Sequence, residues 1–340
     1  MPIPWAIYAH EQSTSNRQSQ HQGKRKAKVQ LKIDTDPIVP RCRNETSQVT
    51  GFPVDIMTSN PLDTTFEHCT DRTQYDSTTH NYIKWNPQDI ELDDFNYLLM
   101  KGAFTIPHTN LRYALLKSYI DHVHPHLPML NLNDFLWRIQ ENDGVHFISP
   151  LLFQTVMFTS TSFVDLKYLH RAGYRDRNSA RKAFFQKARL LYDFDMEVNR
   201  IAIVQSLVLM SYWHDFPEDE KNCRHWLEVG MSLAQRIGLH RNPAESSMGS
   251  GCLQLRKRLW WSIYACGAWV CLRTEESTLL TQADFDVPGL SFGDFDLHPF
   301  QPEIVSVLGL EEFHYSNYHR DLAGNLIQRL NSWCSVDIRR

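Results

Sequence analysis

The sequence lacks the patterns that secreted proteins and membrane proteins require. Its seven cysteines are scattered and form no CxxC pair, which is typical of reduced thiols in an intracellular protein. No basic segment leads into an apolar one at the N-terminus, so we expect no secretory signal. No uninterrupted apolar stretch approaches the roughly 20 residues that span a bilayer, so no membrane association is expected.

Signatures of enzymes are also missing. The chain has no HExxH, no Walker loop and no GxGxxG, and "GMSLA" lacks the second glycine of a GxSxG elbow. Acidic pairs such as Asp193 with Asp195 and Asp294 with Asp296 are expected at helix ends or in loops, where carboxylates cap helices or are solvated. We therefore predict that the protein is not an enzyme, with no catalytic residue and no cofactor of its own.

The charge balance argues against nucleic-acid binding through bulk positive charge, because the formal net charge is −4. One basic run stands out near the N-terminus, formed by Lys24, Arg25, Lys26 and Lys28. It is either a solvated charge run or a tail for nuclear import or nucleic-acid contact. No recognised DNA-reading motif accompanies it, so specific DNA binding by this chain alone is not expected, and the run would supply only salt-sensitive affinity.

The stretch "HVHPHLPML" contains three alternating histidines that suggest a metal site: His122, His124 and His126. His122 ends a helical pattern, and Pro125 biases His124 toward extended geometry, so the imidazoles should diverge. A histidine near a helix C-terminus is also favourable without a metal, because its positive charge meets the negative end of the dipole. We predict no metal ligand here. A metal-dependent hydrolase that uses these histidines is a further hypothesis, to be weighed beside the two given at the end of this section. Metal analysis of the purified protein would test it.

Composition and apolar periodicity divide the chain into three parts. Residues 1–88 are rich in polar residues without apolar periodicity, which predicts a disordered or linker segment carrying the basic run. In residues 89–297, apolar residues recur at helical spacing and strand-like alternation is scarce. The predicted fold is therefore all-α, a multi-helix bundle or an irregular helical array. Residues 298–340 are predicted to be a divergent, partly helical C-terminal segment.

Local signals place several helices. Four apolar residues of "NLRYALLKSYIDHV" recur at helical spacing, namely Leu111, Leu115, Tyr119 and Val123. Ser149 is a plausible N-cap with Pro150 at the first helical position. The segment "RIAIVQSLVLMSYWHDF" is apolar nearly all round, which predicts a buried helix. Gly238 followed by Leu239 suits a Schellman stop, in which glycine takes the left-handed conformation.

Two further helical patterns raise questions of orientation. In "RNSARKAFFQKARLLYDF" the spacing puts Ala183, Gln186 and Leu190 on one side, with Phe184, Lys187 and Leu191 beside them. The segment "LQLRKRLWWSIYACGAWVCL" predicts a helix whose tryptophans are part of the core. Three basic residues are expected at its start, where positive charge opposes the dipole: Arg256, Lys257 and Arg258. They either form a solvated face, pair with carboxylates of a neighbouring helix, or bind an anionic partner.

Specific strings carry more information than periodicity. Five of them occur in this order: "LMKGAFTIPHTNLRYALLKSYIDHVHPHLPMLNLNDF", "LYDFDMEVNRIAIVQSLVLMSYW", "CRHWLEVGMSLAQRIGLHRNP", "RKRLWWSIY" and "DFDVPGLSFGDFD". Together they resemble the middle regulatory region of fungal zinc binuclear-cluster transcription factors, the fungal-specific transcription factor domain. The wording is most similar to the subgroup that includes the cutinase-gene activators. The resemblance covers about residues 89–297 and is carried by these motif residues: His124, Pro125, Pro128, Trp226, Gly238, Leu239, His240, Arg241, Trp260, Trp261, Asp284, Phe285, Asp286 and Pro288.

The chain also departs from that family. Family members carry six cysteines in two CxxC-containing halves near the N-terminus, whereas this chain has only Cys42 and Cys69 before residue 223. Zinc is therefore expected only for the missing cluster, and the basic run resembles the linker that commonly follows it. The arginine-rich tail of the "WWSxYxRDR" helix is replaced by "ACGAW", and the Gly-Arg-Pro turn that usually follows is missing around "LRTEEST".

The resemblance implies a nuclear fungal transcription regulator, made of the helical regulatory domain and lacking its own zinc cluster. It would be either a truncated or a cluster-less member. Its expected partners are other transcription regulators or full-length relatives, and a small-molecule effector is a possible ligand. The alternative is a small-molecule sensor or protein-binding helical module without a role in transcription.

Overall fold

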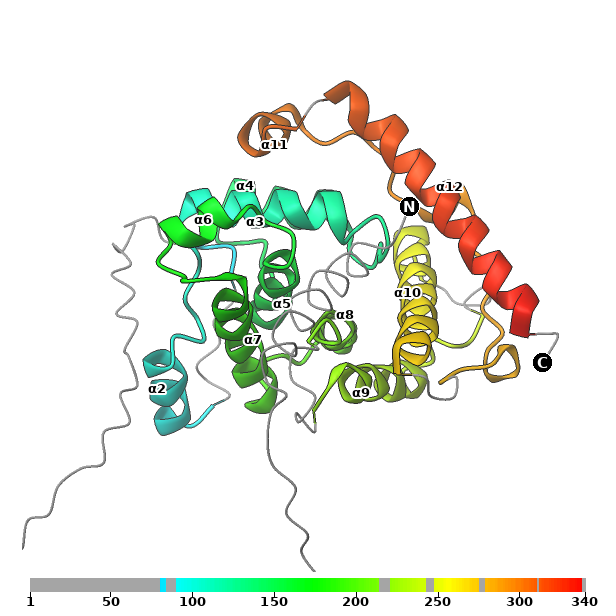
Figure 1. Ribbon diagram of the computed structural model, residues 1–340, viewed down its shortest axis with the longest axis horizontal. Helices are drawn as coiled ribbons and strands as arrows, with labels where there is room; N and C mark the ends of the chain where they lie inside the picture. Colours follow the sequence, from blue (N-terminus) through cyan, green and yellow to red (C-terminus); the bar gives the residue numbers. More distant parts are fainter. Residues whose placement is uncertain are drawn as a thin grey trace, which may run out of the picture. The chain divides into compact units, whose positions relative to one another are not determined.

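The computed structural model describes residues 80–83, 90–213, 221–242, 248–274, 279–310 and 312–337. These residues form helices joined by loops (Figure 1). Within the described ranges, strand-type pairing is limited to an isolated bridge between Ile83 and Ile148. The prediction of an all-α fold is confirmed for this part of the chain. Most of the segment predicted to be disordered, 1–88, lies outside the described residues.

The helices follow one another along the chain with short connections. In order, they are α2 (Leu92–Met100), α3 (Thr109–His122), α4 (Leu132–Glu141), α5 (Pro150–Ser160), α6 (Leu166–Arg171), α7 (Arg177–Asp193), α8 (Arg200–Met210), α9 (Cys223–Arg236), α10 (Ser250–Thr274), α11 (Pro302–Leu308) and α12 (Glu312–Asp337). Two short 3₁₀ helices, η3 (Gln282–Asp284) and η4 (Phe292–Asp294), precede α11. None of the described helices combines the length and the apolar run needed to cross a membrane.

Helices α5 and α8 form the centre of the core. Every residue of α5 is buried, and α5 packs against α3, α7 and α8, while α8 also packs against α9 and α10 (Figure 1). The hydroxyl groups on these two helices donate back to carbonyl oxygens one turn earlier, as Thr155 does to Leu152 and Ser206 does to Ala202. This pairing lets polar side chains be buried without partners on other helices. The prediction of a buried helix over α8 is confirmed.

Local start and stop signals act as the sequence predicts. The Ser149 hydroxyl accepts a hydrogen bond from the backbone N–H of Leu152 at 3.2 Å, directly before Pro150. After α9, Gly238 adopts a φ of +72°, in the left-handed region. Its N–H donates to Gln235 at 3.0 Å, and the N–H of Leu239 donates to Ala234 at 2.9 Å. These two bonds define the Schellman motif, so that prediction is confirmed.

Helix α7 buries one of the two neighbouring rows that its spacing indicates. Ala180, Phe184, Ala188 and Leu191 are buried, whereas Gln186 is exposed. Phe184 and Phe185 direct this face inward because they have far more apolar area to bury than Ala183 and Gln186. The small residues of the buried face, Ala180 and Ala188, let α5 approach closely. The row with Phe184 and Leu191 is therefore the buried one, and the row with Ala183, Gln186 and Leu190 lies beside it.

A short stretch of the N-terminal segment is also packed into the core. Tyr82 and Ile83 are 1% and 3% exposed, and the N–H of Ile148 donates to the carbonyl of Tyr82. The Tyr82 ring lies 5.9 Å from that of Phe153 on α5, measured between centroids. These two residues of the segment predicted to be disordered or a linker are therefore packed against the core.

Candidate functional site

Arg258 of α10 joins two segments that are distant in sequence. Its side chain is buried, and its Nε donates to the carbonyl oxygen of Pro128 at 2.8 Å. Its Nη2 donates to the Asn131 side-chain oxygen at 2.6 Å, and its Nη1 donates to the backbone carbonyl of Asp294. A guanidinium presents several donors in a fixed plane, so one side chain can hold both segments in register.

Lys257 strengthens the same contact. Its Nζ lies 2.7 Å from Oδ2 of Asp294, which also accepts from the backbone N–H and the hydroxyl of Ser291 at 2.7 and 2.8 Å. Burial alone would raise the pKa of Asp294, but the hydrogen bonds from Lys257 and Ser291 outweigh it and hold the pKa below its ordinary value. Burial lowers the pKa of the Arg258 guanidinium, and the nearby carboxylates of Asp296 and Asp294 oppose that shift.

The three basic residues of α10 are thus internal contacts rather than a solvated face. Arg256 completes the set by donating from Nη2 to the carbonyl of Ile237 at 2.9 Å. Helix α10 begins at Ser250, more than one turn before Arg256, so the expected conflict with the helix dipole is absent. Among the described residues, the carboxylate that pairs with them is that of Asp294 on η4, and the other acceptors lie in loops and at a helix end.

One turn further along α10, aromatic side chains hold the segment after η3. The Phe285 ring lies 5.5 Å from those of both Trp260 and Trp261 and packs edge to face against each of them. The indole Nε1 of Trp261 donates to the carbonyl of Pro288 at 2.9 Å. Edge-to-face aromatic pairs add to the free energy gained by burial, so this segment is fixed against the helix.

The loop after α9 reaches the same place. The backbone N–H of Asp286 donates to the carbonyl of His240 at 3.1 Å, and its Oδ1 accepts from the N–H of Asn242 at 2.7 Å. The His240 ring lies 6.0 Å from that of Trp260. Four of the five resembling strings therefore meet along α10. We call this region the motif junction: Pro128, Asn131, His240, Lys257, Arg258, Trp260, Trp261, Phe285, Asp286, Pro288 and Asp294.

Two capping interactions in this region were missed at the level of sequence. Thr281 donates its backbone N–H and hydroxyl to Asp284 at 2.7 and 2.8 Å, and Ser291 makes the equivalent pair with Asp294. The backbone hydrogen bond from Thr281 holds the pKa of Asp284 below its ordinary value. A Ser or Thr followed three residues later by an acid is a capping-box pattern, and "TQADFD" and "SFGDFD" both contain it.

The remaining motif residues lie outside the junction. Trp226 on α9 packs edge to face against Phe185 and Tyr192, at 5.9 and 5.7 Å. Gly238 and Leu239 form the helix stop described above, and Arg241 is exposed beyond it. The candidate nuclear-localisation residues, Lys24, Arg25, Lys26 and Lys28, lie outside the described residues.

The histidines of "HVHPHLPML" contact different elements. The His122 ring lies 5.3 Å from that of Phe163, whereas the His124 ring lies 6.3 Å from that of His319 on α12. Burial lowers the pKa of His124 well below its ordinary value, and burial together with Arg329 lowers the pKa of His126 to about 4. Across the described ranges, no group of three or more His, Cys, Asp or Glu side chains is arranged to hold a metal ion. Pro125, between the histidines, is buried.

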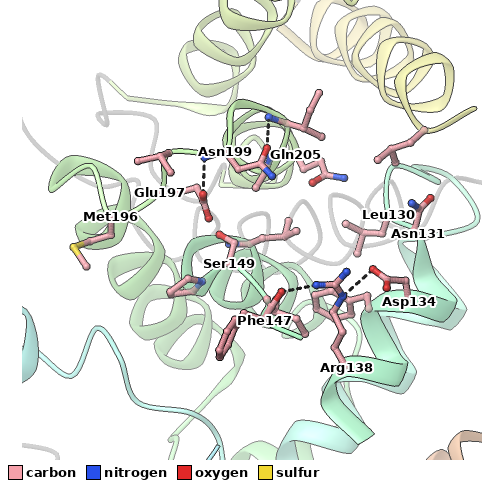
Figure 2. A pocket seen from close by; sticks show the side chains of 18 of the residues that line it. Leu130, Asn131, Asp134, Arg138, Phe147, Ser149, Met196, Glu197, Asn199 and Gln205 are labelled. Atoms are coloured by element: carbon pink, nitrogen blue, oxygen red, sulfur yellow. Dashed lines mark hydrogen bonds and ion pairs between the residues drawn. The ribbon is translucent and has the colours of Figure 1, made fainter. Parts of the chain in front are cut away.

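A cavity of about 450 Å³ lies beside the motif junction, between α4, the start of α5, residues 194–199 and α8 (Figure 2). On its α4 side, Arg138 pairs with Asp134 at 2.9 Å and donates to the carbonyl of Phe147 at 2.8 Å. Leu130 and Asn131, which follow the prolines, form part of its wall. The cavity and the junction therefore share one segment of chain.

Comparison with known proteins agrees with the motif reading. Residues 116–316 match the fungal-specific transcription factor domain. The chain is 43% identical over 236 residues to "Cutinase transcription factor 1 beta" of Fusarium vanettenii, covering 68% of this chain and 27% of the relative. It is 31% identical over 271 residues to "Transcription factor cpaR" of Aspergillus oryzae, covering 79% of this chain and 43% of the relative.

The chain spans less than half the length of these relatives. It is also 26% identical over 200 residues to the "Acetamidase regulatory protein" of Aspergillus fumigatus, covering 58% of this chain and 25% of that relative. No solved structure matches the chain. The names of these relatives are those of two transcription factors and a regulatory protein, and the family predicted from the five strings is confirmed. The matched range includes more than half of the sequence, and the chain belongs to the family of the fungal-specific transcription factor domain.

Proposed function

We propose that this chain is the regulatory part of a nuclear transcription regulator and that it acts through protein contacts or a bound effector rather than through catalysis. The match of residues 116–316 to the family domain carries the proposal. The motif junction supports it, because the family strings serve to hold loops against α10 through Arg258 and Phe285. Other transcription regulators or full-length relatives are the proposed partners, and zinc is proposed only for a DNA-binding cluster outside this chain.

A promoter-tethering experiment tests this role. The full chain is fused to an unrelated sequence-specific DNA-binding domain, and transcription of a reporter carrying its site is measured. We expect reporter output to rise or fall relative to the DNA-binding domain alone, and the Arg258→Met variant to lose the effect because the junction is disrupted. Unchanged output from a fusion that chromatin immunoprecipitation finds at the promoter would contradict the proposal.

The basic run allows a separate test of localisation. A fluorescently tagged chain is expected in the nucleus, and replacing Lys24, Arg25, Lys26 and Lys28 with alanine is expected to reduce its import. Nuclear exclusion that is unchanged by these replacements would favour the second candidate, a small-molecule or protein-binding module without a role in transcription. The cavity beside α8 is the observation that favours this second candidate.

A further inference from the structure

The cavity beside α8 is lined by Gln205, a side chain whose amide is held in one orientation. Gln205 is 5% exposed, and its Nε2 donates to the carbonyl oxygen of Met129, which fixes the orientation of the amide. Gln205 lines the cavity, and the hydrogen bond found for its side chain among the described residues is that of Nε2, which leaves Oε1 open to a donor from the cavity. Figure 2 shows this side chain between Asn199 and Leu130. An oriented amide oxygen at a cavity wall can accept a hydrogen bond from an occupant, so the site suits an occupant that brings a donor.

The size and walls of the cavity suit a small organic molecule. Its volume of about 450 Å³ lies within the range of typical small-molecule sites. Phe135, Leu152 and Ile201 contribute apolar wall. Two further lining residues leave apolar surface in solvent, because Phe147 is 39% exposed and Val198 is 85% exposed. An occupant with an apolar body would cover this surface.

The charges around the cavity disfavour an anion. Arg138, the cation of the lining, is already paired with Asp134. Asp195 and Glu197 leave the lining with an excess of negative charge. The Glu197 carboxylate accepts from the backbone N–H of Asn199 at 2.7 Å, and its second oxygen has lone pairs left for a ligand donor. A neutral or cationic head group fits this arrangement.

The helix N-termini at the cavity do not reverse that preference. Both α5 and α8 begin there, but their first turns are capped by the side chains of Ser149 and Asn199. The Asn199 oxygen accepts from the backbone N–H of Ile201 at 3.0 Å. Donors that already have acceptors within the protein offer little to a bound anion.

We propose that this cavity binds a small molecule with a compact apolar body and one hydrogen-bond-donating head, a hydroxyl or an ammonium, and that the head donates to Oε1 of Gln205. Such binding does not rest on the role in transcription, since it needs only the folded chain. The carbonyl that orients the Gln205 amide belongs to Met129, and Met129 directly follows Pro128, whose carbonyl Arg258 binds. The ligand would therefore lie next to the segment that Arg258 holds.

Three probes with the same rigid body and different heads test the proposal: 1-adamantanol, 1-adamantylamine and 1-adamantanecarboxylate. Binding to the full, purified chain is measured by titration calorimetry and by saturation-transfer NMR, without DNA or a reporter. We expect the alcohol and the amine to bind and the carboxylate to bind at least about tenfold more weakly. Equal affinity for the carboxylate, or dissociation constants weaker than about 1 mM for all three probes, would overturn the proposal.

Matched variants locate the bound probe. Ala202→Leu fills part of the cavity and is expected to weaken the alcohol and the amine at least about tenfold, whereas Ala183→Leu, on α7 away from the cavity, leaves both unchanged. Glu197→Gln keeps the bond to Asn199 and is expected to weaken the amine relative to the alcohol. Gln205→Leu should bring the alcohol down to the affinity of the carboxylate. Unchanged binding in Ala202→Leu with a native circular dichroism spectrum would place the probe elsewhere and refute the assignment.

Discussion

Replacing Arg258 with methionine removes the guanidinium while keeping an unbranched side chain of similar reach. The carbonyl oxygens of Pro128 and Asp294 and the side-chain oxygen of Asn131 then lose their donor at a site where Arg258 is only 2% exposed. Each buried acceptor left without a partner costs about 1–3 kcal/mol, and removing one member of a buried network costs about 3–5 kcal/mol in total. For a domain of this size, that loss corresponds to a fall in Tm of about 10 °C.

Urea unfolding of the full chain, followed by tryptophan fluorescence, measures this loss. Lys257→Met provides a graded comparison, because its side chain is 17% exposed and Asp294 keeps both bonds from Ser291, so about 1–2 kcal/mol should be lost. Arg200→Met, on the exposed first residue of α8, is the control and should stay within about 0.5 kcal/mol of wild type. If Arg258→Met unfolds within about 0.5 kcal/mol of wild type, the junction does not depend on the guanidinium and the reasoning fails.

Three further substitutions test separate parts of the fold. Gly238→Ala places a side chain at a φ of +72° and should cost about 1–2 kcal/mol in urea unfolding, while Gly249→Ala, with open space and no left-handed φ, should cost nothing; equal losses would contradict this. Phe285→Ala should cost about 2–4 kcal/mol and shift tryptophan emission to the red, because the indoles it covers on α10 become solvated; an unshifted spectrum would argue against that packing. Burial lowers the pKa of His126 to about 4 from an ordinary 6.5, so the unfolded chain binds a proton first and stability falls as the pH drops from about 6.5 toward 4. His126→Gln should flatten that part of the stability–pH curve measured by urea titration, and an unaltered slope would assign it to other groups.

Local interactions account for the parts of the fold that the sequence predicted well. The apolar spacing of α3, the cap at Ser149 and the stop at Gly238 depend on residues within a few positions of each other, and the structure shows all three. For α7 the spacing indicated two neighbouring rows but not which one is buried, because periodicity gives the positions of residues but not their apolar areas. Phe184 and Phe185 decide which side is buried, and α5 decides how closely that side can approach.

The contacts of the candidate site could not be read from local patterns. Arg258 and Pro128 are 130 residues apart in sequence, and Arg258 and Asp294 are 36 apart. Helical spacing relates only residues within a few turns, so it cannot predict these contacts. A basic triplet is solvated in most sequences, and burial here depends on carbonyl oxygens that only the folded chain brings together. The five strings identified the segments that meet, and the repeated spacing of Thr281 with Asp284 and of Ser291 with Asp294 was the one local signal that could have added to them.

The segment from Pro128 to Asn131 is held from two sides, and it connects the cavity to α10 through hydrogen bonds. Arg258 donates to Pro128 and Asn131 on one side, and Gln205 donates to Met129 on the other. A displacement of this segment must lengthen hydrogen bonds on both sides, so the positions of Gln205 and Arg258 are not independent. Thermodynamic linkage is reciprocal: an occupant that binds better when this segment is in place stabilises the junction by the same free energy that the junction contributes to binding. An occupant indifferent to the segment would fill the cavity without affecting α10, since a ligand shifts an equilibrium only by its difference in affinity for the two states.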